Sequence, residues 1–176
     1  MTPYPVRWTA EKSVEGTLPN WLTAAIERPD LRQYSSPAEA TALRELVYGL
    51  GTDRHSAKTA RDLTDAALRE WGLTDLAFEV EVVISELVTN ALRHAVPYLS
   101  PAWPIRLRLI HHASYLVCVV QDPSREVPVL NEEDQFAESG RGLHLVEALS
   151  AAWGWSLLQH GKVVWAAFTS FCTPAR

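Results

Sequence analysis

The sequence has few cysteines, no long apolar run and no leader-like N-terminus. Cys118 and Cys172 are its two cysteines, and their spacing suits neither a metal site nor a disulfide framework. No apolar run approaches the roughly 18 residues that span a bilayer. The first residues also lack the basic-then-apolar pattern of a signal peptide. We therefore expect two buried thiols in a cytoplasmic protein that has no membrane partner.

A basic excess is missing as well. Asp and Glu outnumber Lys and Arg by 21 to 16, which gives a net charge of −5. Nucleic-acid-binding proteins usually carry a basic patch or stripe, whereas here Arg106 and Arg108 fall on one face of an expected strand. The charge therefore argues against a nucleic-acid partner.

The composition is that of one globular domain with an extension. Hydrophobic residues make up 47% of the 176 residues and charged residues 21%, and a chain of this length can bury roughly 70% of its unfolded surface. The first 40 residues differ, because they hold five of the eleven prolines together with Trp8 and Trp21. We expect an N-terminal extension over 1–40, with a short helix at 20–28, that is docked or partly disordered. A single domain over 43–172 follows it.

Residues 43–50 allow two interpretations. Ser36 to Glu39 matches a capping box with proline at the first helical position, which favours a helix. Leu46 to Tyr48, followed by Gly49, favours a strand and a turn. We predict the strand.

The rest of the sequence alternates between helical and strand patterns. Apolar residues recur at helical spacing from Ser56 to Trp71 and again up to Ala95, and residues 105–110 alternate as a half-buried strand. We predict helices at 56–71, 76–95 and 142–152, strands at 105–110, 115–120, 155–160 and 163–170, turns at 111–114 and Gly161-Lys162, and loops at 96–104 and 123–139. This order predicts an α+β fold, a two-layer sandwich whose mixed, mostly antiparallel sheet has its helices on one face.

The second predicted helix carries a polar row beside its apolar stripe. Glu86 and Asn90 are four residues apart, so their side chains stack on one face, and His94 continues the row. An amide oxygen suits Mg²⁺ and a carboxylate can act as a general base. An isolated pair with this spacing is more often a solvated helix face, so the pair needs support from elsewhere in the chain.

Two further features stand at the ends of predicted elements. Asp122 ends a buried strand, where it can form a turn or accept a hydrogen bond from an exocyclic amine. Gly140 and Gly142 flank the start of a helix, whose free N–H groups and dipole favour phosphate. An ordinary glycine-rich loop is the alternative, and Leu145 stands where a dinucleotide fingerprint needs its third glycine.

The order of these features resembles the GHKL superfamily, the histidine-kinase-like ATPases with a Bergerat-type ATP-binding fold. The segments SELVTNALRHA, GRGLHLVEALSAAWGW and GKVVW are similar to its small stand-alone branch. That branch contains anti-sigma-factor serine kinases and related regulatory ATP-binding proteins. The resemblance covers about residues 43–170.

The resemblance implies ATP and Mg²⁺ as ligands and gives roles to matching residues. Glu86 matches the family's general base, Asn90 matches its magnesium ligand, and Asp122 matches the residue that binds the adenine amine. The other nucleotide-binding positions that the resemblance implies are Arg93, His94, Ser124, Gly140, Arg141, Gly142 and Leu143.

Two departures from the family pattern concern the adenine end of the site. The first glycine box usually reads D-x-G, whereas here it is Asp122-Pro123-Ser124. The last strand commonly carries a threonine or serine that supports the aspartate, whereas here Val163 stands there and cannot form that hydrogen bond. The phosphate and magnesium end keeps the pattern.

The resemblance implies a serine/threonine protein kinase that phosphorylates an anti-sigma-factor antagonist, and relatives of this type often form homodimers. The alternative is a nucleotide-binding module without kinase activity that binds a sigma factor or another regulator. A degenerate domain with scaffolding contacts alone is the third possibility. The sequence contains no phosphoacceptor histidine box, which argues against an autophosphorylating sensor kinase.

Overall fold

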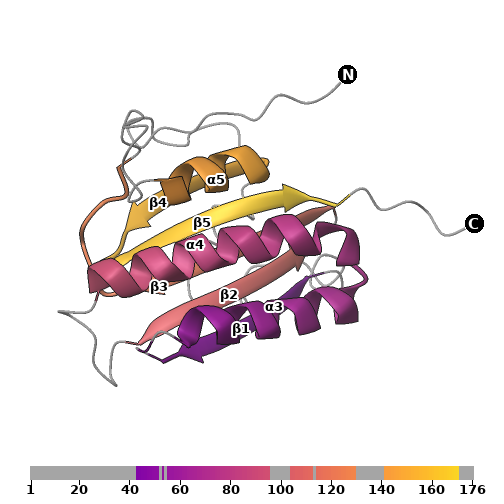
Figure 1. Cartoon of the computed structure of the whole chain (residues 1–176), viewed down its shortest axis with the longest axis horizontal. Coiled ribbons are helices and arrows are strands. Elements are labelled where there is room, and N and C mark those ends of the chain that lie inside the picture. The colour runs from indigo at the N-terminus through magenta and orange to yellow at the C-terminus, as the bar shows by residue number, and fades with distance from the viewer. Residues whose placement is uncertain are drawn as a thin grey trace, which may run out of the picture.

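The computed structural model describes residues 43–51, 53, 55–95, 104–112, 114–129 and 141–170 (Figure 1). The expected extension over 1–40, its helix at 20–28, and Cys172 lie outside these residues. Most of the two expected loops, 96–103 and 130–139, also lies outside them.

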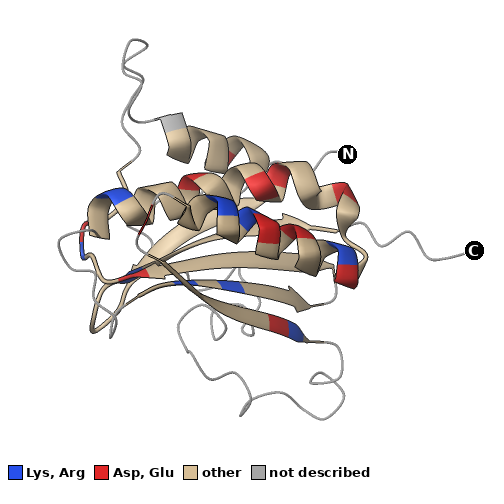
Figure 2. Ribbon diagram, turned by 60° about the horizontal axis from the view of Figure 1, so that its bottom comes forward, with Lys and Arg blue, Asp and Glu red and all other residues tan. Residues whose placement is uncertain are grey.

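The described part of the chain forms a five-stranded sheet with helices on one face (Figures 1 and 2). The elements are β1 (Arg44–Leu50), α3 (Ser56–Trp71), the short 3-10 helix η2 (Thr74–Leu76), α4 (Ala77–Ala95), β2 (Ile105–His112), β3 (Tyr115–Asp122), α5 (Arg141–Leu149), β4 (Ala152–Leu157) and β5 (Lys162–Thr169). The strand order is β1-β2-β3-β5-β4, and every neighbouring pair is antiparallel. The predicted α+β sandwich is confirmed, as is the strand at 43–50, and the described sheet is antiparallel throughout rather than mixed.

Helix α4 lies at the centre of the helical layer and packs on the sheet through its apolar stripe. The residues of this stripe are at most 3% exposed: Val80, Val83, Ile84, Leu87, Val88 and Ala91. Burying each of the larger side chains stabilises the fold by about 1.5–3 kcal/mol. The stripe therefore fixes the rotation of α4 about its axis, and with it the direction in which the polar row of the helix points. Among the described helices, none is both long and apolar enough to cross a membrane.

Alternation along the strands divides the sheet into two apolar faces. The helix-side core takes Leu107, Leu109, Leu116, Cys118, Val120, Ala166 and Phe168, and the second cluster takes Ile110, Val117, Val119, Val163, Trp165 and Ala167. Cys118 is a free and buried thiol, as predicted, and burial raises its pKa above the usual range. By the same alternation, Asp122 at the end of β3 and Lys162 at the start of β5 lie on the helix side.

Strand β2 is longer than the sequence pattern indicates. His111 and His112, predicted as a turn, continue the ladder and pair with Leu116 and Tyr115 of β3. The ring of His111 also stacks on Trp71, with the ring centroids 5.9 Å apart and the planes at 22°. Polar residues therefore extend the strand because one of them packs against α3.

The helix predicted at 142–152 begins where expected but ends three residues early, and the strand predicted at 155–160 is shifted toward the N-terminus. Helix α5 ends at Leu149, where the Ser150 hydroxyl donates to the Val146 carbonyl at 2.6 Å. Strand β4 begins at Ala152, three residues earlier than predicted. Gly154 explains this register, because a Cβ at that position would lie 2.8 Å from the ring of Trp165 on β5.

Candidate functional site

A cavity of about 440 Å³ opens between α4, the start of α5 and the adjoining ends of β3 and β5. Its lining combines the polar row of α4 with apolar residues from the segment that follows β3. The lining residues are Glu86, Leu87, Thr89, Asn90, Ala91, Arg93, His94, Asp122, Glu126, Val127, Pro128, Val129, Gly142, Leu143, Lys162 and Val164.

One wall of the cavity is formed where α5 begins against α4. Gly142, the second residue of α5, lies so close to the polar row that a Cβ there would be 2.5 Å from Oε2 of Glu86. The same Cβ would be 3.6 Å from the Asn90 amide nitrogen. Glycine at this position therefore lets the helix start approach both polar side chains.

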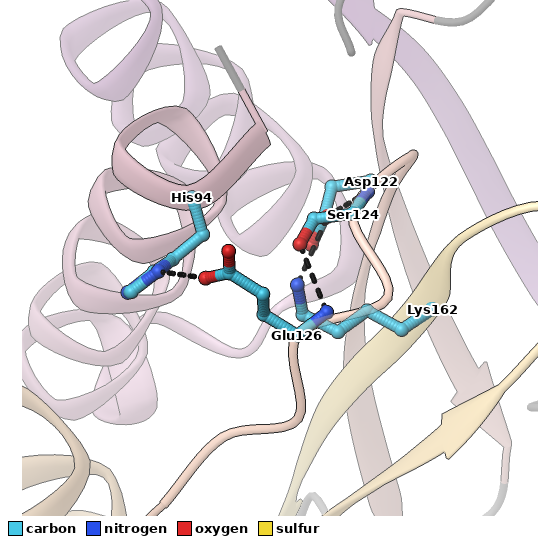
Figure 3. Close-up of polar contacts among 5 residues, drawn as sticks. All are labelled: His94, Asp122, Ser124, Glu126 and Lys162. Atoms are coloured by element: carbon cyan, nitrogen blue, oxygen red, sulfur yellow. Dashed lines mark hydrogen bonds and ion pairs between the residues drawn. The ribbon is translucent and has the colours of Figure 1, made fainter. Parts of the chain in front are cut away.

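The floor of the cavity is a buried ion pair between β3 and β5 (Figure 3). Oδ1 of Asp122 accepts hydrogen bonds from Nζ of Lys162 at 3.0 Å and from the backbone N–H of Ser124 at 2.8 Å. The other oxygen, Oδ2, is buried and has no hydrogen-bond partner among the described residues. The carboxyl group therefore keeps one acceptor oxygen unused.

Burial and the lysine act in opposite directions on this carboxyl group. Asp122 is 2% exposed, and its burial raises the pKa of the carboxyl above its usual value. The charge and hydrogen bond of Lys162, the Ser124 N–H and, more weakly, the charge of His94 lower that pKa and offset part of the rise. The floor thus balances the cost of burying a carboxylate against a cation that favours the ionised form.

Backbone packing holds the end of β3 in place. Gly161, with φ of 95°, sits in the turn between β4 and β5, and any Cβ there would collide with the carbonyl oxygen of Asp122. The guanidinium of Arg125 donates to the carbonyl oxygens of Leu158 and Gln159 at 3.1 and 3.2 Å. These contacts hold the backbone of Asp122 and of the residues that follow it.

A second polar contact crosses the mouth of the cavity. Nδ1 of His94, in the last turn of α4, lies 2.9 Å from Oε2 of Glu126 in the segment after β3 (Figure 3). The two side chains are 45% and 62% exposed, so the pair is solvated and contributes little to stability. Its effect is to place Glu126 at the rim.

The structure brings most of the predicted site residues to this cavity. Those that line it are Glu86, Asn90, Arg93, His94, Asp122, Gly142 and Leu143. Ser124 is fully buried behind Asp122, where its hydroxyl accepts a hydrogen bond from the backbone N–H of Glu126 at 3.1 Å. Arg141 is the first residue of α5, and Gly140 lies outside the described residues.

Two residues at the start of β5 differ from the sequence-based expectation: Lys162 was not predicted as a site residue, and Val163 does not lie beside the aspartate. Gly161-Lys162 reads as a hairpin turn, yet Lys162 is the first residue of β5 and pairs directly with Asp122. Val163, expected beside the aspartate, pairs with Gln121 and belongs to the apolar cluster on the opposite face. A lysine that opens a buried apolar strand is the signal that could have identified this partner.

The groups around the cavity fit the nucleotide and metal that the motifs imply. The unused Oδ2 of Asp122 is an acceptor for an exocyclic amine, and the Asn90 amide oxygen is a ligand of the type that Mg²⁺ accepts beside phosphate oxygens. The described residues contain no group of three or more His, Cys, Asp or Glu that could form an all-protein metal site.

Comparison with known proteins identifies the family of the chain and supports its fold. The family model of the histidine kinase-like ATPase domain matches residues 51–168, more than half of the chain. A solved structure of the RsbU and RsbW domains of Rv1364c from Mycobacterium tuberculosis is similar in fold, with a TM-score of 0.51 and 20% sequence identity. The match covers 71% of this chain and 32% of that chain, so this chain spans about a third of the other's length. No curated protein matches the sequence.

Proposed function

The chain belongs to the histidine kinase-like ATPase family, and from that premise we propose that it is a regulatory serine/threonine protein kinase that uses ATP and Mg²⁺. One observation carries the proposal. Glu86 and Asn90 of α4 line the same cavity as Asp122 of β3, and Oδ2 of Asp122 has no hydrogen-bond partner among the described residues.

The floor of the cavity suits the adenine end of the nucleotide. A buried acceptor without a partner is costly, typically about 1–3 kcal/mol, and Oδ2 of Asp122 is such an atom among the described residues. An exocyclic amine would supply the missing donor. Val164 and Leu143, which also line the cavity, offer apolar surface to a planar base.

The α4 wall suits the phosphate end. Asn90 would hold Mg²⁺, which supplies charge neutralisation on the phosphate oxygens when bound. Glu86 would accept the proton of a partner's serine hydroxyl, so that the hydroxyl oxygen bonds to the terminal phosphorus while the bond to the leaving ADP oxygen breaks. Because phosphoryl transfer depends mainly on positioning and charge, one base and one metal ligand at this wall are sufficient.

The proposed protein partner is an anti-sigma-factor antagonist, with a sigma factor as a further binding partner. The motif resemblance to the stand-alone branch supports this choice. Phosphorylation would add about −1.5 to −2 charge to the antagonist and would disrupt an interface by repulsion and desolvation. We also propose that the chain acts as a homodimer, as relatives of this branch often do.

Calorimetric titration with ATP, with and without Mg²⁺, tests the nucleotide site. We expect the wild-type protein to bind ATP more tightly with Mg²⁺, and the Asn90→Ala variant to lose that dependence. Glu81→Ala is the control, because Glu81 lies on the same helix but does not line the cavity. If Mg²⁺ strengthens ATP binding by the Asn90→Ala variant as much as it does for the wild type, Asn90 is not the metal ligand. No binding by the wild type would favour the non-catalytic partner-binding alternative.

A further inference from the structure

We infer that the ammonium group of Lys162 reads the nucleotide base directly, by donating a hydrogen bond to the ring nitrogen beside the exocyclic amine that Asp122 accepts. The inference rests on the proposed function and adds a specificity-determining residue to it. The inference rests on the juxtaposition of Lys162 and Asp122, which form a buried ion pair and both line the cavity.

The burial of Lys162 is unusual for a lysine. It is 4% exposed, whereas lysine is almost never fully buried in proteins unless it is paired. Its position opposite Asp122 in the β3–β5 ladder and its place on the helix side of the sheet bring its side chain to the cavity floor. A lysine with only a turn-forming role would keep its ammonium group in water.

The ion pair leaves hydrogen-bonding capacity on both partners. An ammonium group has three donors, and Asp122 Oδ1 is the partner that the described residues provide for Lys162. Oδ2 of Asp122 has no hydrogen-bond donor among the described residues. The floor therefore offers an acceptor and a donor side by side (Figure 3).

This arrangement is complementary to a base edge with a donor next to an acceptor. Adenine has such an edge, with the 6-amino group beside N1. Guanine in the same orientation would place its 6-carbonyl oxygen against the acceptor Oδ2 of Asp122 and its N1–H against the ammonium donor of Lys162, so both contacts would be mismatched. Burial raises the pKa of Asp122, and the ammonium group opposes that rise, so it favours the ionised form of the acceptor. Both effects favour adenine.

Titration with ATP analogues tests the contact on the intact protein. In 1-deaza-ATP a C–H group replaces N1, and we expect the wild type to bind it on the order of tenfold more weakly than ATP, because a hydrogen bond to a charged group is lost. 7-Deaza-ATP changes a ring atom that Lys162 does not read, so it should bind like ATP. GTP should bind much more weakly than ATP.

The Lys162→Met variant tests whether Lys162 is the donor. We expect it to bind ATP and 1-deaza-ATP with the same affinity, while Lys58→Met retains the wild-type preference. Lys58 is the matched control because it is an exposed lysine of α3, paired with Asp62 at 2.7 Å and remote in sequence from the floor. Preference for ATP over 1-deaza-ATP that survives in Lys162→Met would overturn the inference.

The analogue series separates this inference from the proposed function. Wild-type protein that binds neither ATP nor its analogues would overturn both. Equal binding of ATP and 1-deaza-ATP by the wild-type protein would overturn only the role of Lys162. This comparison uses the wild-type protein alone, so it does not depend on whether a variant folds. GTP bound as tightly as ATP would overturn the assignment of an adenine edge to the Asp122–Lys162 pair.

Discussion

Gly142 at the start of α5 lies directly against the Glu86 carboxylate of α4, close enough that a Cβ at Gly142 would be 2.5 Å from Oε2. The contact joins the glycine motif to the proposed general base across 56 positions of sequence. No side chain larger than hydrogen fits there while Glu86 keeps its present place. The glycine is therefore required for the present position of the Glu86 carboxylate.

We predict that Gly142→Ala folds but loses activity. The strain should be small, because the clashing atom is the end of the flexible Glu86 side chain and can move. Alanine also favours a helix over glycine by about 1 kcal/mol, which offsets the remaining strain. The displaced Glu86 carboxylate should lower phosphotransfer at least tenfold while the thermal midpoint changes by a few degrees. Gly49→Ala in β1 is the control, since a Cβ there meets nothing within 4 Å. Equal activity of the two variants would contradict the assigned role.

Replacing the proposed base should separate binding from chemistry. We expect Glu86→Gln to bind Mg-ATP like the wild type, because the amide keeps the shape of the side chain, and to lower phosphate transfer by a factor on the order of 10²–10⁴. The assay is transfer of labelled phosphate from ATP to a serine-containing antagonist protein. Glu81→Gln should retain full transfer. Transfer that survives in Glu86→Gln would leave the protein without its proposed base.

The sequence pattern predicted the elements that depend on apolar periodicity. The stripes of α3 and α4 and the alternation of β2 carry the fold, because burying those faces dominates the free energy of folding. The end of α3 was also predictable, since Gly72 adopts a left-handed φ of 73° and its N–H bonds to the carbonyls of Arg69 and Leu68. Local chemistry and packing agree in these elements.

Features that depend on partners far along the chain were not predictable from local pattern. His111 extends β2 because it stacks on Trp71, and Lys162 enters the site because the β3–β5 register sets it opposite Asp122. The stacking of His111 has no local sequence signal, and a lysine at the start of an apolar strand marks Lys162 without identifying its partner. The motifs therefore indicated Glu86, Asn90 and Asp122 as candidates, whereas the residue that supports Asp122 required the tertiary structure.

Gly161 is predicted to be essential for the cavity floor. Alanine there would need an unfavourable φ of 95° and would collide with backbone atoms of Asp122 and Pro123, which cannot move aside as a side chain can. We expect Gly161→Ala to lower the free energy of unfolding by roughly 3 kcal/mol or more. Gly72→Ala also has a positive φ but open space around its Cβ, so it should cost only about 1–2 kcal/mol. Urea denaturation measures both, and equal losses would contradict the predicted clash.

The Asp122–Lys162 pair should show strong energetic coupling. Removing one partner leaves a buried charge uncompensated, so we expect Asp122→Asn to destabilise the protein by about 3–5 kcal/mol. The double variant Asp122→Asn/Lys162→Met should lose less than the sum of the single variants. The exposed pair Lys58–Asp62, at 68% and 63% exposure, is the control cycle and should couple by only about 0.3–0.5 kcal/mol. Additive losses at the buried pair would show that the ion pair contributes nothing to the floor.

Acid should weaken ATP binding by protonating Asp122. The ionised carboxylate is the acceptor, so affinity is present above its pKa and is lost as the pH falls through it. Burial raises that pKa, and Lys162 and His94 lower it. Lys162→Met removes the larger opposing charge, so its loss of affinity should begin at a higher pH than in the wild type. His94→Gln should shift the loss in the same direction by less, because the charge of His94 is the weakest of the causes.

Titrations between about pH 4.5 and 8 measure the shift. The phosphates of ATP titrate identically with every variant, so the difference between proteins reports the carboxyl group. Lys58→Met should follow the wild-type curve. Superimposable curves for Lys162→Met and the wild type would mean that the ammonium group does not control the charge of the base-binding carboxylate.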